Sequence, residues 1–268
     1  MMYSILLIGQ SNAAGRGVPS EVEPLPTDRQ FVQRMGRWRP IYTPVCPDRS
    51  NAGVCFAESF AYRFCQHYNS PIGIIPCAFG GSKVAEWMPG TPLYDNAVFC
   101  SKMAARDSKI VAVLWQQGES DCVPGLYETW GENVLKVFES MRKDIGLGDD
   151  VPFLMGGIPD YIANYEGYLG DIGNYYTFIN DQIEEMAEKN EWISYVPAYD
   201  THMGPDGLHL CAADLRIWGE NFFKKFVEVS DLVPAEEYVP FEAFDDRFEK
   251  QRAAKLAAEK AAAEQAQK

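Results

Sequence analysis

The sequence has no long hydrophobic run and is poor in basic side chains. No stretch approaches the roughly 18 consecutive apolar residues that a transmembrane helix requires, so we expect no membrane partner. Lys and Arg number 24 against 38 Asp and Glu, which gives a formal net charge of -14. This charge opposes the neutralisation of phosphates and argues against nonspecific binding to nucleic acid. The composition favours a small neutral ligand.

Cysteine motifs are also lacking. The seven cysteines are an odd number and include no Cys-x-x-Cys pair, which predicts scattered reduced thiols rather than a disulfide framework or a zinc site. The segment Met1–Ile8 has no basic region ahead of its apolar residues, so it does not read as a secretory leader. We therefore expect a cytoplasmic protein. Removal of a leader ahead of Met1 would give the same beginning and a secreted protein.

Apolar residues are plentiful, and they fall in five short runs. The 268 residues are 47% hydrophobic and 13% aromatic, enough to bury the core of one large domain. Each run has the length of a strand and is apolar enough to be buried on both faces, which predicts a five-stranded parallel sheet. The runs are Tyr3–Ile8, Ile72–Ala78, Ile110–Trp115, Val151–Met155 and Trp192–Val196.

Helical patterns alternate with these runs. This alternation predicts a three-layer α/β/α fold with right-handed crossovers, in which loops at the carboxyl ends of the strands build the functional site. Ser11, the pair Gly80-Gly81 and Gln117 all fall at such ends. The expected helices cover Cys55–Tyr68, Asp95–Asp107, Tyr127–Lys143, Tyr175–Lys189 and Ala212–Val229.

Two segments depart from this alternation. Residues 18–51 are rich in Pro and Arg and show little periodicity, so we expect a long excursion that could wall a pocket. The composition changes after about Asp231, and we divide the chain into one domain at 1–233 and an extension at 234–268. The extension begins with an acidic linker and ends, from Ala253, in an Ala-, Glu- and Lys-rich stretch. That stretch favours a solvated, fraying helix without a core face.

Ser11 is placed where a nucleophile would sit, directly after the first predicted strand. A serine there could simply cap the next helix. Gly9 and the Gly15-Arg16-Gly17 stretch permit a tight turn and close approach of a ligand, which favours the nucleophile. The surroundings of Ser11 do not match the Gly-x-Ser-x-Gly elbow.

His209 is the candidate general base. A serine hydroxyl attacks poorly until a base removes its proton, and the imidazole in turn needs a carboxylate to hold its tautomer. Asp206 lies three residues before His209. The intervening Asp-Gly pair typically makes a plain turn, and such a turn would also bring His209 over the nucleophile. Of the other histidines, His67 lies in a helical pattern and reads as structural, and His202 is less favoured.

Several groups could stabilise a developing oxyanion or contact substrate. Gly80-Gly81 could be an ordinary flexible turn, but its backbone N–H groups can approach a carbonyl oxygen without obstruction by a Cβ. We expect Gly81 or Gly80 to donate, together with the Ser11 N–H and the side-chain amide of Gln117. Glu119 could brace the loop, contact substrate or compete with Asp206 as the acid partner of the imidazole. Further candidates for substrate contact are Gln10, Asn12 and Trp87.

Taken together, four spaced blocks resemble the SGNH/GDSL hydrolase superfamily. The branch they most resemble is that of sialate O-acetylesterases and acetylxylan esterases, carbohydrate esterase family six. The resemblance runs from about residue 3 to 230 and does not cover the extension. The blocks are Gly9-Gln10-Ser11-Asn12, Gly80-Gly81-Ser82, Gln117-Gly118-Glu119-Ser120-Asp121 and Asp206-Gly207-Leu208-His209.

The resemblance implies a flavodoxin-like α/β/α fold and removal of O-acetyl groups from carbohydrates, such as acetylated xylan fragments or O-acetylated sialic acid. It implies no cofactor and no metal, with Ser11 attacking, His209 relaying the proton and Asp206 orienting the ring. In some members a glutamate near the third block serves as the acid, which keeps Glu119 in contention. One departure is Ala13, where the family commonly has methionine.

Two alternatives stay open. The chain could be a broader short-chain esterase, lipase or thioesterase on the same fold, or a carbohydrate-binding pseudoenzyme that has kept the pocket. Comparing acetylated sugars with acyl thioesters as substrates tests the first alternative. A fluorophosphonate probe tests the second, because a pseudoenzyme would bind sugar without labelling of Ser11.

Overall fold

A single sheet of seven strands runs through the protein in the order β3-β2-β4-β1-β5-β6-β7. The computed structural model describes residues 2–165, 172–234, 239–240 and 243–266. The strands are β1 (Met2–Gly9), β2 (Gln30–Arg34), β3 (Arg37–Pro40), β4 (Ile72–Pro76), β5 (Ser108–Gln116), β6 (Phe153–Gly156) and β7 (Ile193–Val196).

All five predicted strands are present and parallel, and β1 lies at the centre of the sheet. It pairs in parallel with β4 on one side and with β5 on the other. The side chains of its second half, from Ile5 to Ile8, are completely buried. A strand with neighbours on both edges and helices over both faces favours apolar side chains, which explains the run from Ile5 to Ile8. The buried Ser4 of the same strand is satisfied by a hydrogen bond with Ser108 at 2.8 Å.

The strand count departs from the prediction, because the excursion at 18–51 supplies two further strands. β2 pairs in parallel with β4, and β3 pairs antiparallel with β2, so the sheet is mixed at this edge. A two-residue turn at Met35-Gly36 joins them, and both residues have positive φ, 51° and 72°. These strands are short, and β3 is largely exposed, so they lack the apolar runs that identified the other five.

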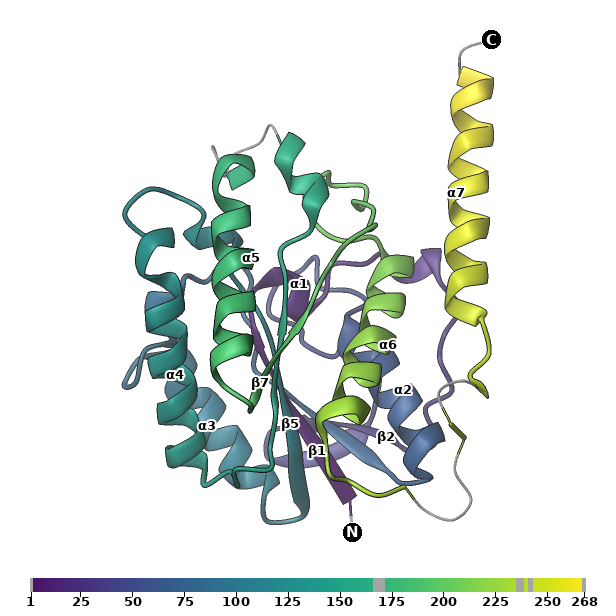
Figure 1. The fold of residues 1–268 in the computed structure, drawn as a ribbon. Coiled ribbons are helices and arrows are strands. Elements are labelled where there is room, and N and C mark those ends of the chain that lie inside the picture. Colours follow the sequence, from purple (N-terminus) through teal and green to yellow (C-terminus); the bar gives the residue numbers. More distant parts are fainter. Residues whose placement is uncertain (1, 166–171, 235–238, 241–242, 267–268) are drawn as a thin grey trace.

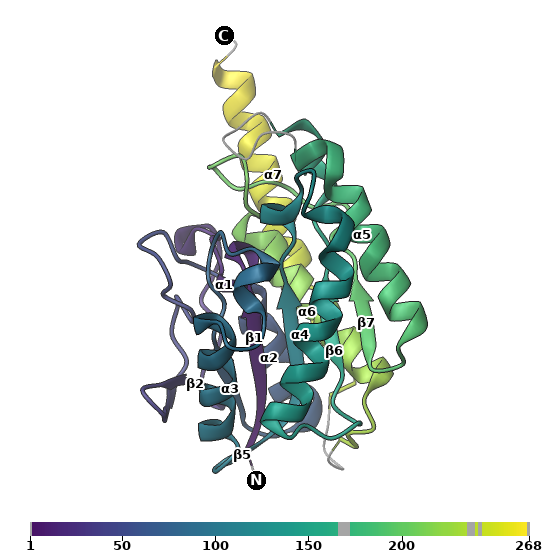
Figure 2. The same cartoon turned by 90° about the vertical axis from the view of Figure 1, so that its left-hand side faces the viewer.

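Helices cover both faces of the sheet (Figure 1). One layer contains α2 (Phe56–Tyr68) and α6 (Ala212–Val229), which share a buried cluster with one face of β1. The opposite layer contains α3 (Pro92–Ala104), α4 (Trp130–Ile145) and α5 (Ile172–Lys189). Figure 2 looks onto the layer of α3, α4 and α5, with the sheet behind it. The predicted three-layer α/β/α fold is confirmed.

Short helical segments occupy several connections. The four-residue helix α1 (Ser11–Ala14) follows β1 directly. The 3-10 turns are η1 (Pro19–Glu21), η2 (Val84–Trp87), η3 (Glu119–Asp121), η4 (Tyr127–Thr129) and η5 (Asp160–Asn164). No described helix has both the length and the apolarity that a membrane crossing would need.

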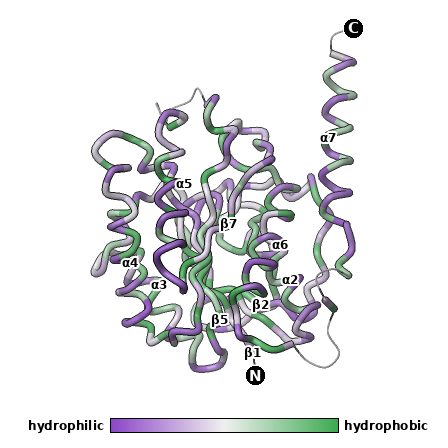
Figure 3. The backbone as a smooth tube through the Cα atoms, viewed as in Figure 1, coloured by the Kyte–Doolittle hydropathy of each residue, from purple (hydrophilic) through white to green (hydrophobic). Residues whose placement is uncertain are grey.

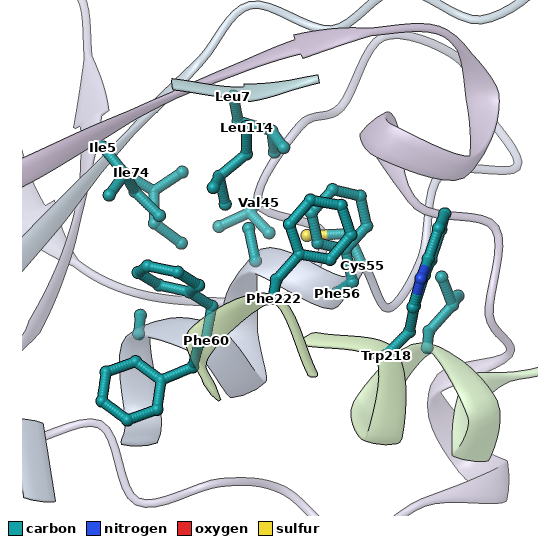
Figure 4. Close-up of a cluster of buried hydrophobic side chains, with 14 of the residues drawn as sticks. Ile5, Leu7, Val45, Cys55, Phe56, Phe60, Ile74, Leu114, Trp218 and Phe222 are labelled. Atoms are coloured by element: carbon teal, nitrogen blue, oxygen red, sulfur yellow. The ribbon is translucent and has the colours of Figure 1, made fainter. Parts of the chain in front are cut away.

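Aromatic side chains fill the layer between the sheet and the α2–α6 pair (Figure 4). The ring of Phe56 stacks on Phe222 at 4.4 Å between centroids and tilts against Trp218 at 5.2 Å. Burial of each such side chain stabilises the fold by about 2 to 3 kcal/mol. Since α6 follows the segment that carries His209, this packing anchors the end of that segment.

The extension ends in α7 (Arg247–Ala266), which begins earlier than predicted. Its first turn packs on the body of the protein, since Phe248 is fully buried. The later turns through residue 265 are mostly exposed and hydrophilic, and they project beyond the sheet (Figure 3). The predicted solvated helix therefore has a docked beginning. Residues 235–238 and 241–242 of the acidic linker lie outside the described part of the chain.

Candidate active site

A cavity of about 440 Å³ opens at the carboxyl edge of the sheet. Its walls come from the segments that follow β1, β4 and β5, from the excursion, and from the loop of residues 197–211 between β7 and α6, here called the histidine loop. The lining residues are Gln10, Ser11, Asn12, Arg16, Arg49, Asn51, Gly80, Gly81, Lys83, Glu119, Ser120, Leu208 and His209.

Ser11 is held in this cavity by the end of the central strand. The backbone N–H of Gln10 donates to the Gln116 carbonyl at 2.7 Å, and Ser11 then starts α1. Gly9 has a φ of 119°, and a Cβ there would lie 2.0 Å from the Gln116 oxygen. Only glycine fits this close approach, so the turn that presents Ser11 depends on it.

The Asp206–His209 pair forms as predicted from the sequence. Asp206 Oδ2 lies 2.6 Å from His209 Nδ1. Its other oxygen, Oδ1, accepts from the backbone N–H groups of Leu208 at 3.1 Å and His209 at 3.0 Å. The hydrogen bond from His209 is the main reason that the pKa of the Asp206 carboxyl lies well below its usual value. With Nδ1 occupied, Nε2 is the ring nitrogen available to a reacting group.

Ser11 and His209 line the same cavity, although no hydrogen bond joins their side chains in the described structure. Asn12 connects the two segments instead. Its Oδ1 accepts from the Leu210 N–H at 3.1 Å, and its Nδ2 donates to Glu119 Oε1 at 2.9 Å. Catalytic hydrogen bonds are often long in unliganded proteins and tighten around substrate.

Glu119 is buried and supports Asn12 rather than the imidazole. Its Oε1 also accepts from Gln116 Nε2 at 2.6 Å, while no hydrogen-bond partner is found for Oε2 among the described residues. The carboxylate that contacts the His209 ring is that of Asp206. The geometry thus favours Asp206 as the acid partner and gives Glu119 a bracing position beside the cavity.

The two candidate glycines differ in what their N–H groups do. The Gly80 N–H donates to Asp48 Oδ2 at 2.7 Å, so it is already used. Gly81 lines the cavity with a φ of 78°, and no acceptor for its N–H is found in the described part of the protein. Of the pair, Gly81 is the one that can donate to a ligand.

Gln117 lies behind the cavity wall and not on it. Its Nε2 donates to Gln10 Oε1 and to the Ser82 carbonyl at 3.2 and 3.1 Å, and it also bonds Asp121. Its Oε1 accepts from Trp130 at 2.8 Å. A fully buried amide with this set of partners has no free N–H for an oxyanion. The structure corrects that expectation and makes Gln117 part of the support for the loop.

Trp87 does not reach the cavity either. It is completely buried, its ring packs edge-on against Trp115 at 5.6 Å between centroids, and its Nε1 donates to Ser82 Oγ at 2.9 Å. A tryptophan so close to a predicted loop suggested a pocket wall, but its large apolar surface belongs to the core below α3. It fixes Ser82 and makes no substrate contact in this arrangement.

The side chain of Gln10 lines the cavity and is held there by hydrogen bonds to its oxygen. Gln10 Oε1 accepts from Gln117 Nε2 and from the backbone N–H groups of Gly118 and Ser120 at 3.3 Å. These bonds fix the amide plane, and no hydrogen-bond partner of Nε2 is found among the residues that the structure describes. Gln10 therefore keeps a donor for a ligand, whereas the Asn12 amide is used on both sides.

The remaining histidines lie outside the cavity. His67 is buried in α2, where its Nδ1 contacts the Val239 carbonyl at 3.0 Å. His202 pairs with the buried Asp214 at 2.9 Å. Among the described residues there is no cluster of three or more His, Cys, Asp or Glu side chains that would hold a metal ion.

Comparison with known proteins agrees with this arrangement. Residues 2–228 match the model of the family described as carbohydrate esterase, sialic acid-specific acetylesterase. The chain belongs to this family. Membership supports carbohydrate esterase activity.

Individual relatives support the same assignment. A probable carbohydrate esterase of Arabidopsis thaliana is 30% identical over 193 residues, which are 62% of this chain and 71% of the relative. The solved structure of an Arabidopsis thaliana protein superimposes with a TM-score of 0.74 at 24% identity, covering 84% of this chain and 98% of that one.

Two solved structures at lower identity share the fold. NanS gives a TM-score of 0.65 at 18% identity, covering 85% of this chain and 97% of its own. Est24, a carbohydrate acetylesterase from Sinorhizobium meliloti, gives 0.55 at 17% identity, with coverage of 85% and 99%.

Several residues of this carbohydrate esterase's cavity were not identified from the sequence. Arg49 and Asn51 come from the excursion, which does wall the cavity, and Arg16 follows α1. The Arg-rich composition of the excursion was a signal of this role, but nothing in it indicated which arginine turns inward. Lys83, Ser120 and Leu208 also line the cavity.

Proposed function

We propose that this chain is a serine esterase that removes O-acetyl groups from a carbohydrate through an acyl-serine intermediate. The observation that supports the proposal most directly is the meeting of Ser11, Gly81 and His209 on one cavity. The 2.6 Å contact between His209 and Asp206 adds the third member of a nucleophile, base and acid set. Such sets are identified by geometry and roles, not by sequence order.

In the first half-reaction, Ser11 Oγ forms a bond to the acetyl carbonyl carbon while His209 Nε2 takes the hydroxyl proton. The carbonyl oxygen becomes an oxyanion, for which the N–H groups of Ser11 and Gly81 are the candidate donors. The bond from the carbon to the sugar oxygen then breaks, and the imidazolium returns the proton to the sugar hydroxyl. Asp206 holds the ring and stabilises its charged form.

In the second half-reaction, water replaces the sugar as the nucleophile. His209 removes a proton from water, the new oxygen–carbon bond forms, and the bond from Ser11 Oγ to the acetyl carbon breaks with return of the proton to Ser11. Acetate leaves and the free serine is restored. The same two N–H groups would stabilise both tetrahedral intermediates.

The cavity wall favours an acidic sugar over a neutral one. Arg16, Arg49 and Lys83 all line it, and Arg16 is neutralised by Asp48 at 2.7 Å. No carboxylate of the described residues pairs with Lys83 or with Arg49, whose Nε and Nη2 bind the Gly80 carbonyl, so both positive charges can attract a substrate carboxylate. They do so despite the net charge of -14 that favoured a neutral ligand. Of the two substrate classes considered, O-acetylated sialic acid carries a carboxylate and acetylated xylan backbone units do not, so we propose the former.

The test compares acetate release from O-acetylated sialic acid and from acetylated xylan fragments at matched acetyl concentrations. The proposal predicts a higher kcat/KM for the sialic acid ester and labelling of Ser11 by a fluorophosphonate probe. Ser120→Ala serves as the labelling control, because its hydroxyl lies in the same cavity. Acyl thioesters hydrolysed faster than either sugar would indicate the broader esterase. Binding of the sugars without labelling of Ser11 would indicate a pseudoenzyme.

A further inference from the structure

We propose that Asp48 and Arg49 are positioning residues that fix the direction of the Gly81 N–H. This inference rests on the proposed function, since it concerns the oxyanion site of the same cavity. The two side chains are consecutive in the excursion, and both bind the backbone of one residue, Gly80. Asp48 accepts from the Gly80 N–H at 2.7 Å, and Arg49 donates to the Gly80 carbonyl from Nε at 3.2 Å and Nη2 at 2.8 Å.

The contact with the carbonyl determines where the next N–H points. The Gly80 C=O and the Gly81 N–H belong to the same planar peptide unit, and in a trans peptide they point in opposite directions. When the guanidinium of Arg49 binds the oxygen, the N–H is directed to the other side of that plane. A cation on the carbonyl also polarises the peptide, which strengthens its N–H as a donor.

Asp48 and Arg49 together are here called the clamp on the Gly80 backbone. Asp48 is itself held rigidly, so this clamp is fixed in place. Arg16 binds it with both terminal nitrogens, at 3.0 Å to Oδ1 and 2.7 Å to Oδ2. The side chains of this ion pair are each only 2% exposed. Arg16 Nη1 also donates to the Gly15 carbonyl at 2.8 Å, and Gly15 ends α1. One buried network therefore links the helix that carries Ser11 to the peptide that carries the second donor.

The shape of Gly80 agrees with a clamp around its backbone. A Cβ at Gly80 would lie 2.2 Å from Arg16 Nη2 and 2.9 Å from Asp48 Oδ2. At Gly81, by contrast, the nearest heavy atom to a Cβ is Arg49 Nη2 at 3.7 Å, so space is not limiting there. Gly80 is required by the close approach of the clamp, and Gly81 by its φ of 78°.

Arg49 is the residue to change, because it is exposed while its guanidinium rests on the Phe79 ring at 5.1 Å. Arg49→Met removes the carbonyl contact and preserves much of the aliphatic packing. We expect kcat on a neutral ester, p-nitrophenyl acetate, to fall about 10- to 100-fold with KM within about twofold, since loss of one oxyanion donor typically lowers kcat about 100-fold or more. The affinity of a boronic acid that forms a tetrahedral adduct should fall by the same factor.

Two further variants complete the test. Arg49→Lys keeps the charge with a single donor group and should recover part of the activity. Arg37→Met removes an exposed arginine from β3 of the same excursion and should match the wild type. Unchanged kcat of Arg49→Met on the neutral ester would overturn the proposal, and so would a loss confined to KM for an acidic sugar, which would make Arg49 a substrate-binding residue.

A readout without turnover separates this proposal from the proposed function. The amide ¹⁵N and ¹H shifts of Gly81 report its peptide orientation in the free protein. They should move in Arg49→Met and stay in Arg37→Met, even if the wild type hydrolysed no ester. Unchanged chemical shifts of the Gly81 amide in Arg49→Met would contradict the proposed positioning role, and the esterase proposal would be unaffected. If the wild type hydrolysed no ester but the Gly81 shifts changed in Arg49→Met, only the esterase proposal would be contradicted.

Discussion

The two sides of the cavity are built in different ways. Ser11 follows β1, which pairs along most of its length with a strand on each edge. His209 instead lies in the histidine loop, which follows β7, a four-residue strand that pairs with β6 at the edge of the described sheet. Ser11 is positioned by the backbone of the central sheet, whereas the His209 imidazole is positioned by hydrogen bonds within and around a loop.

Those hydrogen bonds form a small ladder of their own. Met203 and Leu210 make an antiparallel bridge, and Cys211 N–H donates to the His202 carbonyl at 3.0 Å. The loop is then tied to its surroundings by Asn12, by the hydroxyl of Tyr161, which donates to the Leu208 carbonyl at 3.1 Å, and by α7. The contrast teaches that damage to side chains should affect the histidine loop far more than the position of Ser11.

Ser11→Ala should show the largest loss of activity with the smallest loss of stability. Removal of the hydroxyl should lower kcat by about 10⁴-fold or more, because the proposed acyl intermediate forms on Ser11 Oγ. The midpoint of urea unfolding should change by less than the equivalent of about 1 kcal/mol, since the sheet fixes this backbone without the side chain. Acetate release and fluorescence-monitored unfolding provide the two measurements.

Asp206→Asn tests the other side. We expect kcat to fall about 100- to 10,000-fold, because an amide no longer selects the imidazole tautomer or stabilises its cation. Glu119→Gln should have the smaller effect on kcat, as Glu119 bonds Asn12 and Gln116. A pair of kcat values in the reverse order would transfer the acid role to Glu119.

Gln117→Ala should lower the stability of the fold more than it lowers the activity of the folded molecules. The change leaves the buried Trp130 Nε1 without a partner and removes one of two hydrogen bonds to Asp121 Oδ2, which keeps the bond from the Val84 N–H. Loss of the partner of a buried polar group costs about 1 to 3 kcal/mol. We expect the free energy of unfolding to fall by about 2 to 4 kcal/mol, with kcat per folded molecule reduced less than about tenfold. Active-site titration combined with urea unfolding separates the two quantities. A stable variant with kcat reduced about 100-fold would restore Gln117 as an oxyanion donor.

Arg252→Ala tests whether α7 steadies the histidine loop. Arg252 contacts the buried Asp214 at 3.1 Å and binds Asp200 at 2.8 Å. Its loss should reduce the free energy of unfolding by about 1 to 2 kcal/mol, since Arg252 is itself partly exposed. Amide hydrogen exchange at 200–211 should accelerate. Lys260→Ala, an exposed cation on the same helix, is the matched control, and equal exchange in both variants would remove α7 from this role.

Low pH should reduce the difference in stability between the wild type and Asp206→Asn. The pKa of the Asp206 carboxyl is lowered by its bond with His209, so its contribution to stability is present above the ordinary value of about 3.9 and is lost as the pH falls toward the folded-state value. The difference between the urea midpoints of the two proteins should be largest near pH 7 and should shrink from pH 5 to pH 3. A difference that widens in acid would contradict this linkage.

The sequence predicted the sheet core and the positions of Ser11, Asp206 and His209 well, because these depend on local rules. Buried parallel strands need continuous apolar runs, and a short Asp-Gly turn fixes the distance between a carboxylate and an imidazole three residues later. The direction of long side chains follows no such rule. Gln117 and Trp87 turned into the core, and Arg49 turned toward the cavity, through contacts that include residues distant in sequence. These are Trp130 for Gln117, Trp115 for Trp87 and Gly80 for Arg49.

The edge of the sheet was harder for the same reason. β2 and β3 are short and partly polar, and their pairing with β4 depends on a turn at Met35-Gly36 that leaves Met35 fully exposed. The docking of α7 likewise depends on single residues, above all Phe248, in a segment whose composition otherwise favours solvent.

The central place of β1 has a consequence for synthesis of the chain. β1 precedes the other strands of the sheet in the sequence, yet it pairs with β4 and β5, and the cavity that Ser11 lines is completed by His209, so these two residues are separated by most of the polypeptide. Until residues 108–116 have emerged, the apolar face and edge of β1 lack their partners and need protection from association. A nascent chain that stops before α6 should carry the nucleophile in an unfinished and inactive state.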